Sequence, residues 1–260
     1  MSHLQIEQAI FTSADKGTMK GYQLVARSPG IDRALSQQLC RWSPSHGSLN
    51  EDDLDQWVLS TFPLSDGRSA VARTIFGGPE YSGRGGIQVV TQLLVVREDQ
   101  FASYQCNAFA LAQTAITLGE MRFCPAPPSR LPVITLPDQP LVACVAEPHG
   151  PMLKYHRVHS SDGVDAAQLM NVLQRLHDNQ SVAVIGSNNP IKFASHVIER
   201  IPSDERPTIS ITTGLEPTLG RPFRLHFLPQ LDSNRQRVFE SLGVQCVSAN
   251  ADAEALPVCT

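Results

Sequence analysis

The stretch IQVVTQLLVV, residues Ile87–Val96, carries apolar side chains on both of the faces that a β-strand presents. Such a strand is typical of the interior of a sheet, where both faces are covered. Two further strand-like runs precede it, Val58–Leu64 and Ser69–Phe76, and a Ser-Asp-Gly turn at 65–67 joins them. Ile87–Val96 is therefore predicted to be a central strand of a sheet in the N-terminal half.

The residues on either side extend this pattern. Gln5–Thr12 and Tyr22–Ser28 are short apolar-polar runs separated by turn-forming residues at 13–17, which predicts a hairpin. Residues 99 to about 118 have apolar side chains at helical spacing and are predicted as one helix. We expect residues 1–123 to form a β-rich N-terminal domain with an antiparallel or mixed sheet.

The segment GGPEYSGRGG, Gly77–Gly86, has five glycines in ten positions. Such a segment cannot pack as regular structure, so the sequence predicts a mobile or specially shaped loop. Gly83, Gly85 and Gly86 are predicted to lie in an exposed loop beside a partner-binding surface, with Arg84 as a contact.

Two arginines on predicted strands of the same half, Arg27 and Arg73, are candidates for the same partner-binding surface. The planar guanidinium group suits recognition of carboxylates or phosphates. The alternative is that these arginines are independent surface residues.

Six prolines fall between residues 124 and 140. They exclude a helix and favour an extended connector, so this segment is the predicted domain boundary. Beyond it strand-like and helical patterns alternate through residues 141–248, which predicts an α/β second domain with some parallel strand pairing. Residues 249–260 are predicted to be a loose tail. The expected fold class is α/β (α+β).

The turn Gly186-Ser187-Asn188-Asn189 is the most site-like local pattern. It follows a buried strand, Ser181–Gly186, and precedes a helix opened by Pro190, so Asn189 is a plausible N-cap and the free amides could hold an anion. The sequence around this turn matches neither of the phosphate-binding motifs GxxxxGK[ST] and GxGxxG. A capped strand-helix junction and a phosphate site both remain open.

No motif indicates a metal, a cofactor or a catalytic residue. The six cysteines form no CxxC pair, which indicates reduced thiols instead of a zinc site. His156 and His159 fall in a strand-like stretch that points them to opposite faces. No GxSxG is present. We therefore expect no cofactor and no structural metal.

The formal charge of −4 and the pI near 6.0 exclude the uniformly basic surface of duplex-binding proteins, so nucleic acid is not an expected partner. The first residues, MSHLQIEQAIFTS, contain neither a basic region nor an apolar signal core, and no later stretch offers 18 uncharged apolar residues. We expect a cytoplasmic protein without membrane contact.

Three stretches together resemble the N-terminal domain of the bacterial GTPase-associated protein 1 families. They are IEQAIFTSADKG…GYQLVARSPGI, LCRWSPSHGSL, and FPLSDGRSAVARTIFGGPEYSGRGGIQVVTQLLVV. Residues 201–206 and 210–213 are similar to motifs of the family's middle region, so the resemblance spans about 5–213. Gln92 stands where the family has a histidine after threonine.

This resemblance implies a non-enzymatic adaptor or recognition module that works beside a small GTPase in a bacterial signalling or conflict system. It supplies no catalytic residue. A second hypothesis, from the residues themselves, is a nucleotide-binding enzyme or hydrolase that uses the turn at Gly186–Asn189.

Overall fold

The computed structural model describes residues 2–16, 19–50, 53–80, 86–141 and 165–249 of the 260-residue chain. Its first elements are β1 (His3–Lys16) and β2 (Met19–Arg27), which form an antiparallel hairpin. The predicted hairpin is confirmed, with longer arms than the sequence pattern suggested. Asp32 then caps α1 (Arg33–Trp42) by accepting a hydrogen bond from the Leu35 amide.

The next three strands form an antiparallel meander: β3 (Trp57–Pro63), β4 (Ser69–Pro79) and β5 (Ile87–Val96). β5 lies between β4 and β1, and Leu93 pairs with Ala72 on one side and Ala9 on the other. The prediction that IQVVTQLLVV is an interior strand is therefore confirmed.

Part of the glycine-rich segment is regular structure, contrary to the sequence prediction. β4 continues through Gly77 and Gly78 to Pro79, with a register shift after Phe76. Gly78 has a φ of 91°, and a Cβ on Gly77 would lie 2.4 Å from Val90 Cγ2. The glycines thus permit an irregular strand pressed closely against β5.

A second correction concerns the helix predicted over residues 99 to about 118. The structure has two helices there, α2 (Glu98–Ser103) and α3 (Ala108–Thr117). Gln105 and Cys106 between them have φ values of 51° and 53°, which no α-helix accommodates. The Asn107 side chain then caps α3 by accepting from the amides of Phe109 and Ala110.

The C-terminal part alternates helices and strands, as predicted. Its elements are α4 (Ala166–His177), β7 (Ser181–Ile185), α5 (Pro190–Arg200), the 3₁₀ helix η1 (Arg206–Thr208), β8 (Ile211–Thr212), β9 (Leu225–Leu228), α6 (Ser233–Leu242) and β10 (Val244–Ser248). β7 runs parallel to both β10 and β9, and β9 runs parallel to β8. The predicted parallel pairing in this half is therefore confirmed.

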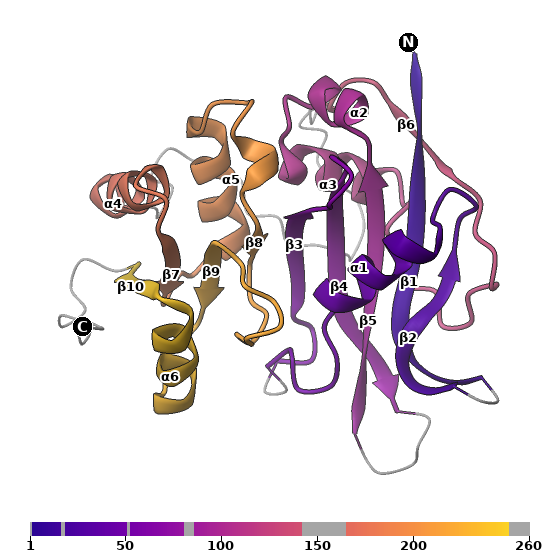
Figure 1. Ribbon diagram of the computed structural model, residues 1–260, viewed down its shortest axis with the longest axis horizontal. Coiled ribbons are helices and arrows are strands. Elements are labelled where there is room, and N and C mark those ends of the chain that lie inside the picture. The colour runs from indigo at the N-terminus through magenta and orange to yellow at the C-terminus, as the bar shows by residue number, and fades with distance from the viewer. Residues whose placement is uncertain (1, 17–18, 51–52, 81–85, 142–164, 250–260) are drawn as a thin grey trace, which may run out of the picture.

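One mixed sheet of ten strands passes through both halves (Figure 1). The strand order is β10-β7-β9-β8-β3-β4-β5-β1-β2, and β6 (Ile134–Pro137), inside the proline-rich segment, pairs with β1. β3 and β8 join the two halves through only two residue pairs, Ser60↔Thr212 and Thr61↔Ile211. The residues on either side of 124–140 thus share a sheet, and the division into two domains stays a prediction.

Helices cover both faces of this sheet. The largest core contains side chains of α3, α4 and α5 together with Leu59, Val71, Leu94 and Phe227 from strands of both halves. On the opposite face, α1 packs against β1, β4 and β5, while Phe239 of α6 packs against Leu228. The two halves therefore bury apolar surface in common, which is the main stabilising term in folding.

Candidate functional site

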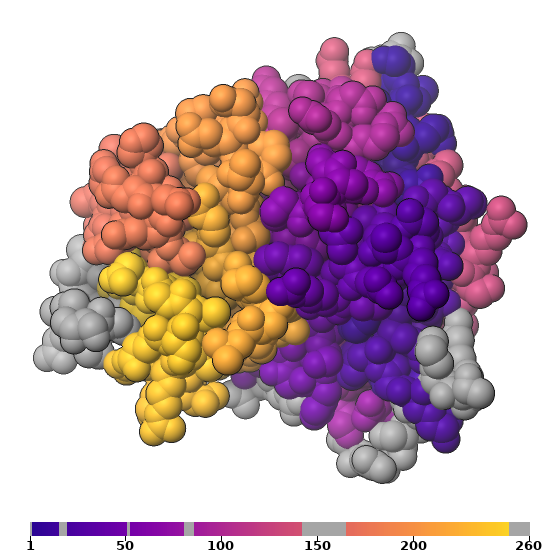
Figure 2. Space-filling view, viewed as in Figure 1, coloured from indigo at the N-terminus to yellow at the C-terminus, as the bar shows by residue number. Residues whose placement is uncertain are grey.

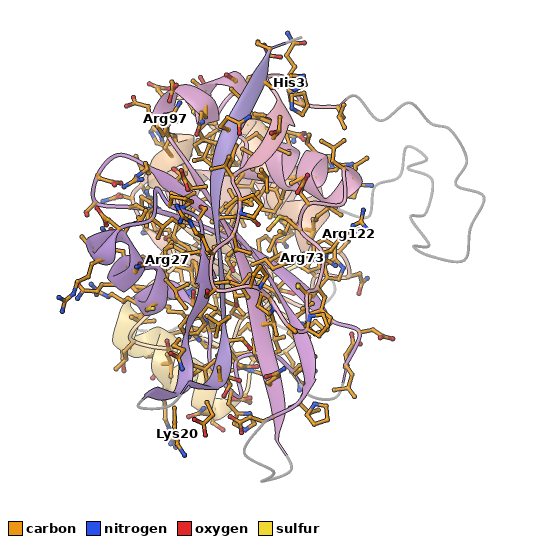
Figure 3. All side chains as sticks on the ribbon, turned by 90° about the vertical axis from the view of Figure 1, so that its right-hand side faces the viewer. His3, Lys20, Arg27, Arg73, Arg97 and Arg122 are labelled. Carbon is orange, nitrogen blue, oxygen red and sulfur yellow. The ribbon has the colours of Figure 1, made fainter. Side chains whose placement is uncertain are left out.

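Arg27 lies at the end of β2, where its side chain is exposed. Its Nη1 donates hydrogen bonds to the Ser36 hydroxyl and to the Asp32 carbonyl, the latter at 3.4 Å. Figure 3 shows Arg27 beside α1, which carries Ser36. Because the guanidinium group stays accessible, Arg27 remains a candidate for contact with a partner.

Arg73 is held inside the fold. Its Nη1 donates to the Met121 carbonyl at 2.6 Å, and its guanidinium carbon lies 5.1 Å from the centroid of the Trp57 ring. The Gln92 side chain donates to the neighbouring Arg122 carbonyl. Arg73 and Gln92 thus hydrogen-bond the chain after α3 to the sheet. Arg73 and Arg27 lie apart in the structure and do not form one surface (Figure 3).

Only the end of the predicted glycine-rich contact loop is described. Gly86 closes the loop by accepting a hydrogen bond from the Glu80 amide at 2.8 Å, and a Cβ on Gly86 would lie 3.4 Å from the His46 ring. Gly83, Arg84 and Gly85 lie outside the described residues, so their role as partner contacts stays a prediction.

The turn Gly186–Asn189 connects β7 to α5. Asn189 Oδ1 accepts a hydrogen bond from the Lys192 amide at 3.0 Å, and Pro190 begins the helix. This contact confirms that Asn189 is an N-cap, and it occupies an amide that an anion at the helix end would use. Gly186, with a φ of 79°, supplies the left-handed conformation of the turn.

This turn lies where the chain leaves two neighbouring parallel strands in opposite directions. From β7 it passes through α5, on one face, to β8 beyond β9; from β9 it passes through α6, on the other face, to β10 beyond β7. Ligands of open parallel sheets bind at such a switch point. The four turn residues, Gly186, Ser187, Asn188 and Asn189, therefore lie at the position where this architecture places ligands.

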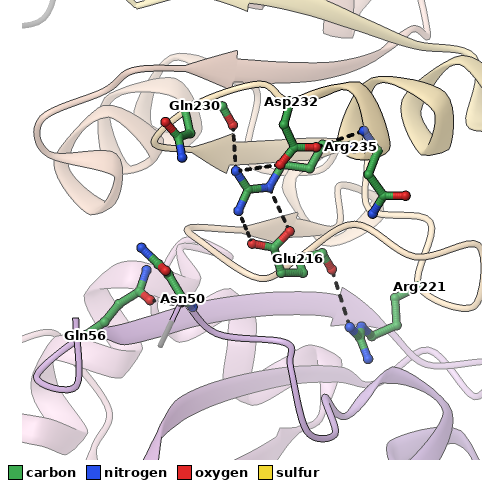
Figure 4. Close-up of polar contacts among 8 residues, drawn as sticks. Asn50, Gln56, Glu216, Arg221, Gln230, Asp232 and Arg235 are labelled. Carbon is green, nitrogen blue, oxygen red and sulfur yellow. Dashed lines mark hydrogen bonds and ion pairs between the residues drawn. The ribbon is translucent and has the colours of Figure 1, made fainter. Parts of the chain in front are cut away.

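Two acidic side chains at this end of the sheet, Asp232 and Glu216, already make hydrogen bonds and ion pairs within the chain. Asp232 caps α6 by accepting from the amides of Arg235 and Asn234, and these bonds lower the pKa of its carboxyl. Arg235 Nε donates to Glu216 Oε2 at 2.9 Å, and Arg235 Nη1 lies 3.3 Å from Asp232 Oδ2 (Figure 4). With its guanidinium paired to two carboxylates, Arg235 is not free to bind a phosphate.

Two basic side chains are buried close to this network. Arg221 donates to the Ser48 hydroxyl at 3.1 Å, and burial lowers the pKa of its guanidinium. His226 is 1 % exposed, between the rings of Phe223 and Phe239. Burial lowers the pKa of His226 to about 3, and the charge of Arg221 adds to that effect, so the imidazole is neutral at pH 7.

An open pocket of about 290 Å³ lies between α4, the end of α5 and η1. We call it the α4–α5 pocket; Figure 2 shows the coral surface of α4 beside the orange surface of the segment that contains α5. Its apolar wall consists of Met170, Leu173, Leu176, Ile201, Pro202 and Ile209. Arg200, Arg224, His177 and Glu205 supply its charged and titratable groups. The pocket combines apolar surface with charge, as binding sites do.

The arginines in and near the α4–α5 pocket differ in how many hydrogen bonds they make within the chain. Arg206 donates to three carbonyls, those of Ile201, Gln105 and Glu199, at 2.8, 2.8 and 3.1 Å. Arg200 and Arg224 each donate to one carbonyl, and within the described ranges neither makes an ion pair. Arg206 does not line the pocket and uses its guanidinium group in these internal bonds, while Arg200 and Arg224 line it and offer further donors to a ligand.

Sequence reasoning missed the α4–α5 pocket because its residues come from three elements between 170 and 224. One sequence signal did exist: Met170 lies outside the apolar stripe of α4 formed by Leu169, Val172 and Leu176, and it is 61 % exposed.

In the part of the chain that the structure describes, no three His, Cys, Asp or Glu side chains come together as a metal site. His156 and His159 lie outside that part. The same described ranges contain no helix long and apolar enough to cross a membrane.

Comparison with known proteins gives a match to a family model. Residues 5–133 match the family described as GTPase-associated protein 1, N-terminal domain type 2. No curated protein and no solved structure gives a significant match to the chain. The matched segment covers β1 to β5 and α1 to α3. The α4–α5 pocket and the Gly186–Asn189 turn lie beyond it.

Proposed function

Residues 5–133 belong to the family of GTPase-associated protein 1 N-terminal domains of type 2, and from this premise we propose that the protein is a non-enzymatic adaptor. It recognises another protein in a bacterial GTPase-linked signalling or conflict system, and it works in the cytoplasm. The proposed partner is a small GTPase or a protein that acts with one.

The structural observation that supports this proposal, beside the family match, is the α4–α5 pocket. Its apolar wall is open to the surface, and Arg200 and Arg224 beside it keep hydrogen-bond donors available. Apolar anchors beside arginines are typical of protein–protein contact sites. In the N-terminal domain, Arg27 and the loop residues Gly83, Arg84, Gly85 and Gly86 are proposed as additional contacts, whereas the internal bonds of Arg73 favour a structural role.

Affinity purification of the tagged chain from its native host, followed by mass spectrometry, tests the adaptor function. We expect a GTPase to be recovered with the wild type and to be depleted in an Arg84→Ala variant whose melting temperature is nearly unchanged. Recovery of no GTPase under mild conditions would contradict the proposal. A large fall in the melting temperature of Arg84→Ala would instead show that Arg84 is a structural residue.

A second function, nucleotide binding at the turn Gly186–Asn189, is favoured by one observation: the turn lies at the switch point between β7 and β9. Two observations oppose it. Asn189 caps α5, and the carboxylates of Asp232 and Glu216 are at the same end of the sheet. Negative charge close to a phosphate weakens its binding.

Substitution of Asn189 separates the two functions. If the side chain acts only as a cap, Asn189→Ala should lower the free energy of unfolding by about 0.5–2 kcal/mol. Asn189→Asp should be tolerated, because aspartate caps equally well and suits the positive end of the helix. Urea denaturation of the three proteins measures this, and calorimetric titration of the wild type with GTP, ATP and NAD should show no micromolar binding.

If the turn grips a phosphate, the wild type binds a nucleotide and Asn189→Asp abolishes that binding with little loss of stability, because the new carboxylate repels the ligand. That pair of results would move the protein into the nucleotide-binding class.

A further inference from the structure

The apolar wall of the α4–α5 pocket contains surface that the core does not use. Leu169, Val172 and Leu176 of α4 are buried in the main core, whereas Met170 on the same helix is 61 % exposed. Leu173 beside it is only partly buried. Methionine adapts its shape to different apolar groups, which suits it to a surface that receives a partner's side chain.

The charges around this wall favour an acidic occupant. The pocket lining contains two arginines, Arg200 and Arg224, and one carboxylate, Glu205. The pocket is therefore locally cationic, although the chain has a formal charge of −4. Arg224 Nη2 donates to the Leu176 carbonyl at 2.9 Å, and Arg200 Nη1 donates to the His196 carbonyl at 3.1 Å. A guanidinium group has five N–H donors, so each can also bind a carboxylate.

Size and helix polarity argue against a nucleotide in the α4–α5 pocket. Its volume of about 290 Å³ is at the lower limit of the roughly 300–1,000 Å³ found for small-molecule sites. α4 and α5 both end at the pocket, close to His177 and Arg200, and helix C-termini carry partial negative charge. These ends repel a phosphate group, which carries up to two negative charges, more than they repel a carboxylate, which carries one.

We propose that the α4–α5 pocket binds an acidic peptide segment of a partner protein. The segment places one large apolar side chain against Met170 and Leu173, while its Asp or Glu carboxylates pair with Arg200 and Arg224. This inference rests on the adaptor function proposed above and identifies the chemistry of the partner.

Selection of a phage-displayed random dodecapeptide library on the purified wild-type chain tests the inference. We expect the enriched peptides to carry Asp or Glu within about one helical turn or three residues of a Leu, Ile, Met or Phe. A synthetic peptide from this set should bind at least about tenfold more weakly to Arg200→Glu and to Met170→Asp than to the wild type. Its binding should weaken as the salt concentration rises.

Loss of folding is not expected to explain loss of binding in these variants. Met170 and Arg200 are exposed, so their exchange should leave the melting temperature nearly unchanged, which a thermal scan checks. Arg224 is avoided because it also bonds α4. Arg237→Glu is the matched control: Arg237 is an exposed arginine on α6, away from the pocket, and it should not change peptide binding.

Each other outcome overturns the inference. Enrichment of basic or uncharged peptides, no enrichment, or acidic peptides whose affinity does not depend on Arg200 and Met170 would all exclude this occupant. The adaptor function is judged separately: if the GTPase is recovered equally with wild type and Arg200→Glu, only the pocket inference fails. If acidic peptides bind as expected but no GTPase is recovered, only the GTPase link fails.

Discussion

Acidification from pH 7 to pH 4.5 is expected to lower the free energy of unfolding by about 2–3 kcal/mol more in the wild type than in His226→Leu. In the folded chain His226 has a pKa of about 3, compared with 6.5 for an ordinary histidine, because its ring is buried. Between these values the unfolded chain binds a proton that the folded chain does not. The stability that neutral His226 provides is therefore complete above pH 6.5 and is lost as the pH falls towards 3.

Urea denaturation of both proteins at the two pH values, followed by circular dichroism, measures this difference. Carboxylates elsewhere titrate in the same way in both proteins, so the comparison isolates His226. Leucine has a similar size and no charge, and it leaves Arg221, the basic neighbour that acts on His226, in place. Equal losses of stability in the two proteins would contradict this prediction, because they would show that burial does not lower the pKa of His226.

The second large effect is expected from Phe227→Ala. Phe227 is 1 % exposed and packs edge-on against Phe193 at 5.5 Å between ring centroids, so removing the ring should cost about 3–5 kcal/mol. The core that contains Phe227 also contains Val71 and Leu94 of the N-terminal strands. We therefore expect both halves of the variant to unfold together, at a lower denaturant concentration than in the wild type.

Trp57 reports on this coupling, since it lies on β3 in the N-terminal half. Trp42 contacts Phe223 of the C-terminal half at 5.0 Å and would mix the signals, so the experiment uses a Trp42→Phe background. With Phe227→Ala, the fluorescence and circular dichroism transitions should shift equally. Leu219→Ala, at a site 66 % exposed, is the control and should change stability by less than about 0.5 kcal/mol. A Trp57 transition that stays in place would support two independent domains joined at 124–140.

The sequence predicted those parts of the fold in which local pattern and burial agree. Ile87–Val96 is apolar on both faces and is an interior strand. The alternation of strand and helix patterns likewise predicted the parallel strand pairing of the C-terminal part. The Asn189 cap was also predictable, because capping depends on residues that are adjacent in the chain.

Features that depend on distant contacts were not predictable. The break between α2 and α3 requires left-handed backbone at Gln105 and Cys106, which neither residue type suggests. The internal bonds of Arg73 depend on Met121, 48 residues later in the chain. Likewise, the α4–α5 pocket exists only because α4, the end of α5, η1 and the residue before β9 meet in space.

The short junction between β3 and β8 has a consequence for synthesis of the chain. The hydroxyls of Ser60 and Thr212, which are 3.0 Å apart in the folded protein, are separated by 152 residues. At a synthesis rate of roughly 5–20 residues per second, β8 leaves the ribosome about 8–30 s after β3. During that interval β3 has an unpaired edge, and such an edge is a template for strands of other chains. A chaperone that shields nascent β3 would protect this protein more than one that acts after release.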